Sequence, residues 1–434
     1  MNFAESVSYL YSLGNEVLAM KLGLETVQAL ASALDNPQQK FPAVHIAGTN
    51  GKGSTAAMTE AILRAANLKT GLFTSPHLVS ITERCRVNGS NISENDFARL
   101  ATVVREAGET LVADGRLEAP PTFFEQVTMI AYLHFAESKV DLAVLEVGMG
   151  GRLDATNICQ PLVTAITAIG FDHQKHLGNT LAAIAGEKAG IIKANVPAVV
   201  ALQPAEAMAA ISARAAELNA PLVSVANESF AAESIGEFGR YRLSYRGLNA
   251  TLGLRGRHQT ENAMTAILIA EQLQQLGWSI DGKTIETGLR DVIWPGRLQL
   301  IDLAKLAAPV LVDGAHNPAG AETLRSFLTE DCGQRPVTLI FGAMNDKAAF
   351  EMAKLLFPVA QNLILTKADN LRAASPQSIA EQTKKLRQDS VCTENLAEAF
   401  AEAARVTPAD GLIVVCGSLY LAGELLSYLT TYVD

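Results

Sequence analysis

The fold is decided by the stretch AVHIAGTNGKGST at residues 43–55. An apolar run rich in strand-forming residues leads into Gly48, and a segment rich in Ala, Met and Leu follows Gly53. This order predicts a strand, a glycine loop and a helix. Glycines let backbone N–H groups turn toward phosphate oxygens, and a helix N-terminus adds partial positive charge. The stretch therefore predicts a phosphate-binding loop.

Side chains within this loop carry the predicted chemistry. Lys52 would neutralise the outer phosphates, and the hydroxyl of Ser54 or Thr55 would meet a metal ion or a phosphate. The loop departs from the standard P-loop pattern G-x-x-x-x-G-K-[ST], because Ile46 replaces the first glycine and Gly53 separates Lys52 from Ser54. The alternative is a glycine-rich turn with an incidental lysine, and the strand–loop–helix context argues against it.

Length and composition set the class of the protein. The 434 residues exceed what one hydrophobic core usually supports, so two domains are expected. Hydrophobic residues make up 49% and charged residues 18%, as in a well-buried globular protein. The net charge of −10 argues against a nucleic-acid partner, which would need a basic stripe. Small anionic substrates need only a local positive pocket.

Cysteine usage and the termini bear on localisation. The five cysteines are scattered and lack C-x-x-C pairs, which predicts reduced thiols in the cytoplasm rather than zinc ligands or disulfides. The N-terminus carries Glu5 and no basic region, so a signal peptide is not expected. No apolar run is long enough to span a bilayer. We expect a soluble cytoplasmic protein with no nucleic-acid or membrane partner.

The first part of the chain alternates predicted helices and strands. Near-continuous apolar runs at 141–148 and 162–169 are typical of parallel strands covered by helices on both faces. Residues 221–256 alternate polar and apolar, which predicts an antiparallel ribbon. Residues 1–40 have apolar residues at helical spacing, namely Leu10, Leu13, Val17, Leu18, Leu22, Val27, Leu30 and Leu34. We predict an α/β domain with a P-loop and a mostly parallel sheet over residues 1–294.

A second domain follows a break in the pattern. The break is the segment WPGR at 294–297, where we place the boundary. A new alternation of strands and helices then begins, with strands predicted at 310–313, 337–341, 362–365 and 412–416. This alternation predicts a smaller, doubly wound (Rossmann-like) α/β domain over residues 295–434.

Three candidate metal ligands of the first domain follow predicted strands. Glu146 ends a buried strand, where a carboxylate is costly unless it is paired or bound to metal, and an acidic residue on such a strand helps P-loop proteins to hold Mg²⁺. The alternative is an ordinary salt bridge. Ser75 either adds an oxygen ligand or merely closes a turn. His173 stands alone, and Mg²⁺ prefers oxygen ligands, so a structural role is the stronger alternative.

Further candidates have two open interpretations each. Lys188 lies on a mostly apolar predicted helix and is either exposed or, in apolar surroundings, a neutral amine with a lowered pKa. Asp313, His316 and Asn317 cluster at the end of a strand, where they either contact a ligand or form a capping turn. Arg297 either reaches a phosphate or is a solvated charge.

Together these motifs resemble one known family. In chain order they are GTNGKGS (48–54), TSPHL (74–78), ER (83–84), EVGMGGRLDATN (146–157), DH (172–173), EKAGIIK (187–193), WPGR (294–297) and DGAHNP (313–318). The set is similar to folylpolyglutamate synthase and dihydrofolate synthase, which belong to the Mur ligase superfamily of ATP-dependent amide-forming enzymes. The resemblance covers nearly the whole chain and includes the departure from the standard P-loop.

The resemblance implies a complete set of site residues. ATP would be bound by Thr49, Asn50, Gly51, Lys52, Gly53, Ser54, Asn262, Arg297, Asp313 and His316. Two Mg²⁺ sites are implied, the first at Ser75 and Glu146 and the second at His173 and Lys188, with the lysine as an N6-carboxylysine that offers oxygen ligands. The pterin ring of the folate or pteroate would contact Thr122, Phe123, Phe124, Glu125, Leu153, Asp154 and Ala155. Lys52, Glu146, His173 and Lys188 would be catalytic.

The resemblance also implies a reaction. A monomeric ligase would use ATP to add L-glutamate to dihydropteroate and to the terminal γ-carboxylate of reduced folates, through an acyl phosphate. The sequence leaves open whether both activities are present or folylpolyglutamate synthase activity alone. A cell-wall Mur ligase fits less well at Lys52-Gly53-Ser54 and at RLDATN (152–157). From another class, the alternative is a nucleotide-binding regulatory ATPase.

Overall fold

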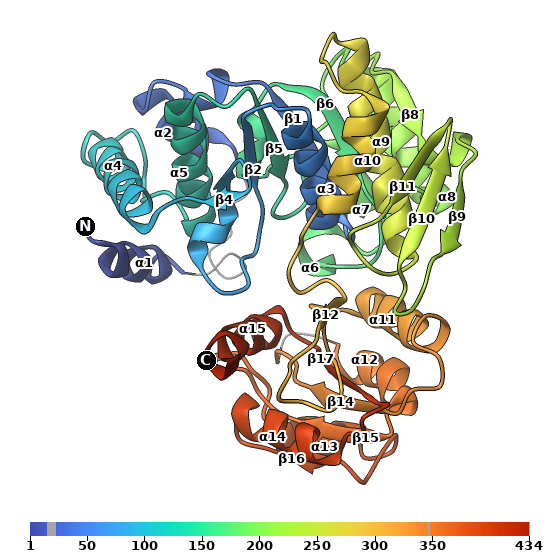
Figure 1. The fold of residues 1–434 in the computed structure, drawn as a ribbon. Coiled ribbons are helices and arrows are strands. Elements are labelled where there is room, and N and C mark those ends of the chain that lie inside the picture. The colour runs from blue at the N-terminus through green and yellow to red at the C-terminus, as the bar shows by residue number, and fades with distance from the viewer. Residues whose placement is uncertain (15–22, 346–347, 434) are drawn as a thin grey trace. The chain divides into compact units, whose positions relative to one another are not determined.

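The computed structural model describes residues 1–14, 23–345 and 348–433, and the chain divides into two compact units (Figure 1). Unit 1 comprises residues 1–230, 245–250 and 261–292, and unit 2 comprises residues 231–244, 251–260 and 293–434. Of the predicted N-terminal helical positions, Val17, Leu18 and Leu22 lie outside the described residues.

Unit 1 is built on an eight-stranded sheet with the order β4-β3-β2-β5-β1-β6-β7-β8. Its strands are β1 (Ala43–Ala47), β2 (Thr70–Phe73), β3 (Cys85–Val87), β4 (Ser90–Asn91), β5 (Leu142–Glu146), β6 (Pro161–Ile166), β7 (Ala198–Val200) and β8 (Leu222–Ser224). Only the pairings that involve β3 and β4 are antiparallel. The predicted P-loop sheet is therefore confirmed, with β1 between β5 and β6.

Helices cover this sheet. They are α1 (Phe3–Ser12), α2 (Glu25–Ala33), α3 (Lys52–Ala65), α4 (Glu94–Ala113), α5 (Phe123–Ser138), α6 (Gln174–Leu177), α7 (Leu181–Ala189), α8 (Ala205–Glu217), α9 (His258–Gln275) and α10 (Gly282–Asp291), with 3₁₀ turns η1 (Pro37–Gln39), η2 (Ile81–Arg84), η3 (Ala155–Ile158) and η4 (Val225–Asn227). One core joins α1, α2, α4 and α5 to Ala43, Phe73 and Leu145 of the sheet. Another joins α7 and α8 to Ile166 and Val200.

A three-stranded antiparallel sheet follows, made of β9 (Ala231–Ser234), β10 (Tyr241–Tyr245) and β11 (Leu248–Thr251). The predicted ribbon over 221–256 is therefore confirmed only from residue 231 onward. Residues 222–224 instead form β8 at the edge of the parallel sheet. A strand of three residues is too short for alternation to distinguish the two pairings.

Unit 2 contains a six-stranded sheet with the order β12-β13-β17-β14-β15-β16. The strands are β12 (Gln299–Ile301), β13 (Val310–Val312), β14 (Val337–Phe341), β15 (Asn362–Leu365), β16 (Val391–Cys392) and β17 (Leu412–Cys416), and the helices are α11 (Pro318–Glu330), α12 (Ala349–Leu356), η5 (Phe357–Val359), α13 (Pro376–Thr383), α14 (Leu396–Val406) and α15 (Leu419–Val433). Only β12 runs antiparallel.

The two faces of this second sheet have separate cores. Leu339 and Phe341 pack with α11, α12 and α13, whereas Ile340 between them packs with α14 and α15. Alternate residues of one strand thus reach opposite faces, as both-sided helical cover requires. The doubly wound prediction is confirmed.

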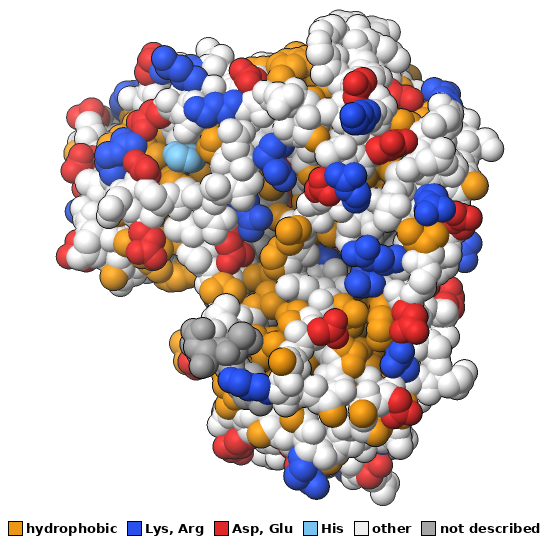
Figure 2. All heavy atoms as spheres, viewed as in Figure 1, with side chains coloured by type: hydrophobic (Ala, Val, Ile, Leu, Met, Phe, Trp, Pro, Cys, Tyr) orange, Lys and Arg blue, Asp and Glu red, His pale blue; other side chains and the backbone are white. Residues whose placement is uncertain are grey.

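The surface agrees with the charge balance of the sequence. On the face drawn in Figure 2, Lys and Arg side chains stand among Asp and Glu rather than in a continuous basic stripe. Among the residues that the structure describes, no helix is both long and apolar enough to cross a bilayer.

Candidate functional site

The glycine loop joins the end of β1 to the start of α3, as the sequence predicts. Gly48 has φ +151° and Gly51 has φ +86°, values that favour glycine. A Cβ on Gly48 would lie 1.8 Å from Thr167 Oγ1, and a Cβ on Gly51 would lie 2.3 Å from Asn262 Oδ1. The missing side chains therefore let the loop pass against Thr167, the residue after β6, on one side and against Asn262 of α9 on the other.

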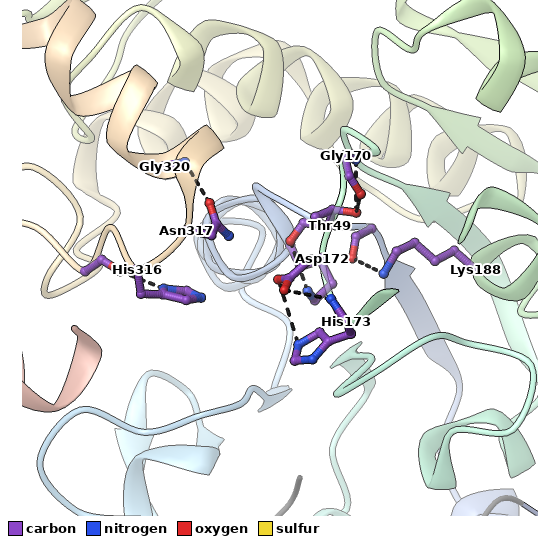
Figure 3. Close-up of polar contacts among 11 residues, drawn as sticks. Thr49, Gly170, Asp172, His173, Lys188, His316, Asn317 and Gly320 are labelled. Carbon is purple, nitrogen blue, oxygen red and sulfur yellow. Dashed lines mark hydrogen bonds and ion pairs between the residues drawn. The ribbon is translucent and has the colours of Figure 1, made fainter. Parts of the chain in front are cut away.

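Backbone contacts fix the first half of this loop. The N–H groups of Thr49 and Asn50 donate to Ala168 O at 3.0 and 3.1 Å. The Thr49 hydroxyl donates to Gly170 O and accepts from Gly170 N, both at 3.1 Å (Figure 3). An α-helix leaves its first N–H groups without partners inside the helix, so the N–H groups of Lys52 and Gly53 at the start of α3 are of the kind that binds anions.

Lys188 on α7 contacts the same loop. Its ammonium group donates to Gly48 O at 2.8 Å, and the residue is only 5% exposed (Figure 3). Burial, and then the positive charge of Lys52, lower the pKa of Lys188 to about 7, while Asp172 and Asp154 oppose the shift. The structure thus decides between the two interpretations of this lysine in favour of the buried amine.

Lys52 lies on the loop as well. Its Nζ donates to Thr49 O at 3.3 Å, and the side chain is half-buried. Two lysines from different helices thus contact one glycine loop. Their mutual repulsion is offset where an anion binds. The arrangement favours a ligand with several negative oxygens.

Glu146 and Ser75 come together at the neighbouring strand end. Glu146 is the last residue of β5 and pairs in register with Ile46, directly before the loop. It is 5% exposed, and its Oε2 accepts from Ser75 N at 3.2 Å. Ser75 follows β2, which is paired with β5 on the other side. A carboxylate and a hydroxyl residue therefore lie together beside the strand that leads into the glycine loop.

Asp172 and His173 lie on the β6 side of the loop. The His173 N–H donates to Asp172 Oδ1 at 2.9 Å, and His173 Nε2 lies 3.8 Å from Asp172 Oδ2 (Figure 3). His173 has φ +49° and precedes α6. Sequence reasoning gave no separate role to Asp172, although its position next to His173 was a usable signal. The negative charge of Asp172 raises the pKa of Lys188, against the larger effect of burial.

The site can be tested for its fit to Mg²⁺. Within the described part of the chain, no three His, Cys, Asp or Glu side chains form a group that could hold a metal ion. Mg²⁺ does not need one, because it usually takes one or two carboxylates together with substrate phosphates and water. Glu146 with Ser75 fits that requirement. Lys188 fits only with a carboxylated amine, because an ammonium group repels a cation.

Residues 122–125 form the start of α5. Thr122 and Glu125 make a capping box, in which Glu125 Oε2 accepts from Thr122 N at 2.7 Å and from its hydroxyl at 2.8 Å. Phe123 is buried and stacks on Tyr11, with ring centroids 5.6 Å apart. Phe124 is half-buried, and a Cβ on Gly148 would lie 2.5 Å from its ring. Phe124 therefore borders the turn that follows Glu146.

Asp154 closes that turn. Its Oδ2 accepts from Met149 N at 2.9 Å, and its Oδ1 accepts from Thr156 N at 3.0 Å. Burial raises the pKa of Asp154, and the hydrogen bond from the Thr156 side chain is the largest of the contributions that oppose this shift. Ala155 is buried and Leu153 is half-buried. The turn is thus rigidly held beside Phe124.

In unit 2, two segments, residues 296–298 and 313–316, lie against each other and carry Arg297, Asp313 and His316. Asp313 is buried and accepts from Leu298 N and Ala315 N, both at 2.9 Å. Burial raises its pKa, and the charge of Arg297 opposes this shift. A Cβ on Gly314 would lie 2.6 Å from Arg297 Nη1. His316 Nδ1–H donates to Gly314 O at 2.8 Å (Figure 3).

Asn317 has the capping role that the sequence left open. Its Oδ1 accepts from Gly320 N at 2.8 Å at the start of α11 (Figure 3). The capping turn at Asn317 therefore exists beside the cluster of Asp313 and His316, so the one does not exclude the other. The tautomer of His316 follows from its contact, since a ring nitrogen that meets a carbonyl oxygen must donate, and this leaves Nε2 as the acceptor of the neutral ring.

Comparison with known proteins matches the two parts of the chain to two protein-family models. Residues 46–270 match the family model described as Mur ligase middle domain, and residues 296–419 match the one described as Mur ligase, glutamate ligase domain. The chain is 34% identical over 421 residues to the dihydrofolate synthase/folylpolyglutamate synthase of Bacillus subtilis (strain 168), covering 95% of this chain and 96% of that protein.

Solved structures agree with this match. The folylpolyglutamate synthase of Mycobacterium tuberculosis complexed with ADP and AMPPCP is 32% identical with a TM-score of 0.87, and the alignment covers 98% of this chain and 99% of that one. E. coli FolC in complex with DHPP and ADP is 29% identical with a TM-score of 0.85, over 100% of this chain and 99% of that one.

Proposed function

We propose that this chain, which belongs to the folylpolyglutamate synthase and dihydrofolate synthase family of Mur ligases, carries both activities of that family. As an ATP-dependent ligase it would add L-glutamate to dihydropteroate and to the terminal γ-carboxylate of reduced folates. Support for the double activity comes from the B. subtilis relative, whose name carries both activities. We further propose a monomer in the cytoplasm, in keeping with five cysteines that are all free thiols.

The ATP phosphates are assigned to the glycine loop. Thr49, Asn50, Gly51, Lys52, Gly53 and Ser54 would surround them, and Asn262, which lies against Gly51, would also contact the nucleotide. Arg297, Asp313 and His316 would bind the nucleotide from the C-terminal domain, which we take as residues 295–434. The observation that carries this assignment is the convergence of Lys52 and Lys188 on the loop carbonyls at 3.3 and 2.8 Å.

Two Mg²⁺ sites complete the proposal. Ser75 and Glu146 would hold the first ion, and His173 with a carboxylated Lys188 would hold the second. When bound, the ions would neutralise phosphate charge and polarise the phosphoryl group. The neutral Lys188 amine can attack CO₂ to give the carbamate and one proton, and its pKa of about 7 makes that amine available at neutral pH.

The acceptor acid would lie in a pocket formed by Thr122, Phe123, Phe124, Glu125, Leu153, Asp154 and Ala155. A carboxylate oxygen of the acceptor acid attacks the γ-phosphorus of ATP, ADP leaves, and an acyl phosphate results. The glutamate amine then attacks the acyl carbon, loses a proton, and inorganic phosphate leaves. Lys52 supplies charge where the γ-phosphoryl group is transferred.

Parallel synthesis assays test this function. The purified protein is given ATP, Mg²⁺ and L-glutamate with either dihydropteroate or a reduced folate, and the amide products are measured. We expect products in both assays. Product from the folate alone would reduce the assignment to folylpolyglutamate synthase. ATP turnover that depends on neither acid nor on glutamate would contradict ligase activity and favour a regulatory ATPase.

Replacing Gly51 with alanine should weaken ATP binding. The positive φ and the 2.3 Å approach to Asn262 Oδ1 force the loop to move, so we expect the KM for ATP to rise about tenfold and stability to fall by about 1–2 kcal/mol. Steady-state kinetics and urea unfolding measure both. Gly115→Ala is the matched control, because Gly115 has φ +69° with nothing within 4 Å. If both variants changed KM equally, the contact with Asn262 would have no role.

A further inference from the structure

A buried histidine connects the strand before the glycine loop to the turn after Glu146. His45 lies in the middle of β1 and is 0% exposed. Its Nε2 lies 2.8 Å from Thr156 Oγ1, and Thr156 belongs to η3. Its Nδ1 is buried and has no hydrogen-bond partner among the described residues. A leucine would fill similar space without leaving a buried nitrogen unpaired, so packing alone does not account for this side chain.

The direction of each hydrogen bond in this connection can be worked out. The Thr156 hydroxyl lies 2.5 Å from Asp154 Oδ1 and donates to it, as the backbone N–H groups of Met149 and Thr156 also do to this carboxyl group. The hydroxyl proton is then used, so the contact with His45 requires an N–H on Nε2. Burial, and then the charge of Lys193, lower the pKa of His45 to about 3, so the ring is neutral and carries this single proton.

The chain of donors ends on the turn described above. Asp154 also holds Met149 N, and Tyr132 OH fixes the same short helix by donating to Thr156 O at 2.8 Å. Each donor polarises the next, which strengthens the bond that Asp154 accepts.

We infer that His45 is a positioning residue, which through Thr156 holds Asp154 and the turn at 148–151 in the geometry that the acceptor acid needs. The inference rests on the proposed function, since the turn borders the assigned pocket. His45 does not touch substrate in this account. Its effect should therefore appear in the KM for the pteroate or folate substrate and not in the KM for ATP.

Five variants test this role. His45→Leu and Thr156→Val break the chain, and we expect each to raise the KM for dihydropteroate about tenfold or more while the KM for ATP stays within about twofold. His45→Gln and Thr156→Ser keep a donor or a hydroxyl and should stay close to wild type. Thr164→Val is the matched control, because Thr164 is equally buried, pairs with His45 in register, and donates its hydroxyl to Pro197 O, away from Asp154.

Equal rises in both KM values, or unchanged KM values in folded Thr156→Val protein, would overturn the inference. A readout that needs no activity is the ¹⁵N NMR spectrum of histidine-labelled protein, with His45→Gln to identify the signal. We expect a neutral ring protonated at Nε2, and a ring protonated at Nδ1 would refute the chain. If the wild-type protein made no amide product, the proposed function would fail while the tautomer measurement still decided the geometry.

Discussion

Replacing Lys52 with alanine should lower kcat for amide synthesis by about 10³-fold. The ammonium group at the start of α3 supplies charge where the phosphoryl group is transferred, and no other lysine lies in that turn of the helix. The KM for the acceptor acid should change little, because the assigned pocket lies on α5 and the turn after Glu146. Steady-state kinetics with each substrate varied in turn measure these quantities.

The Lys52 variant has a further expected effect on Lys188. The Lys52 charge helps to lower the pKa of Lys188, so its removal should raise that pKa. Lys40→Ala is the control, because Lys40 forms a surface ion pair with Asp35. A Lys52→Ala enzyme with kcat within tenfold of wild type would contradict phosphate binding by this loop.

Replacing Lys188 with alanine should lower activity by at least about 10²-fold, and small carboxylates such as acetate should partly restore it. The substitution removes the proposed carbamate and leaves space in which a free carboxylate can lie. The wild-type enzyme should also depend on CO₂. Because the pKa of Lys188 is about 7, the amine is neutral above that pH, so CO₂-depleted enzyme should regain activity on CO₂ addition faster at pH 8 than at pH 6.

Lys188→Arg is the matched control for this rescue. Arginine keeps a positive charge, fills the space and forms no carbamate, so acetate should not restore its activity. Wild-type rates in Lys188→Ala, or a loss that neither acetate nor CO₂ affects, would show that this lysine does not act as a carboxylated ligand.

The fold was largely predictable because its strands are buried on both faces. The runs that form β5, β6 and β14 are nearly all apolar, and such runs can be predicted as strands without knowledge of the strands they pair with. The strands β12, β16 and β8 have three, two and three residues, respectively, and such short segments show no period. Their place depends on what they pair with, which the sequence does not display.

The sequence was enough to propose residues for the candidate site, but it did not show the contacts between them. The glycine spacing and the buried glutamate indicated Lys52 and Glu146 directly. Nothing near Lys188 in the sequence distinguished a buried amine from an exposed one, because its acceptor, Gly48 O, lies 140 residues away. The connection from His45 to Thr156 spans 111 residues and was not foreseen for the same reason.

If ATP activates the acceptor acid as an acyl phosphate, one oxygen of the acid leaves with the inorganic phosphate. The most direct test uses dihydropteroate with ¹⁸O in its carboxylate, together with ATP and L-glutamate, and measures the isotope in the inorganic phosphate by mass spectrometry. We expect one ¹⁸O atom in each phosphate released during amide synthesis. Phosphate free of ¹⁸O, with amide product formed at the same time, would contradict it.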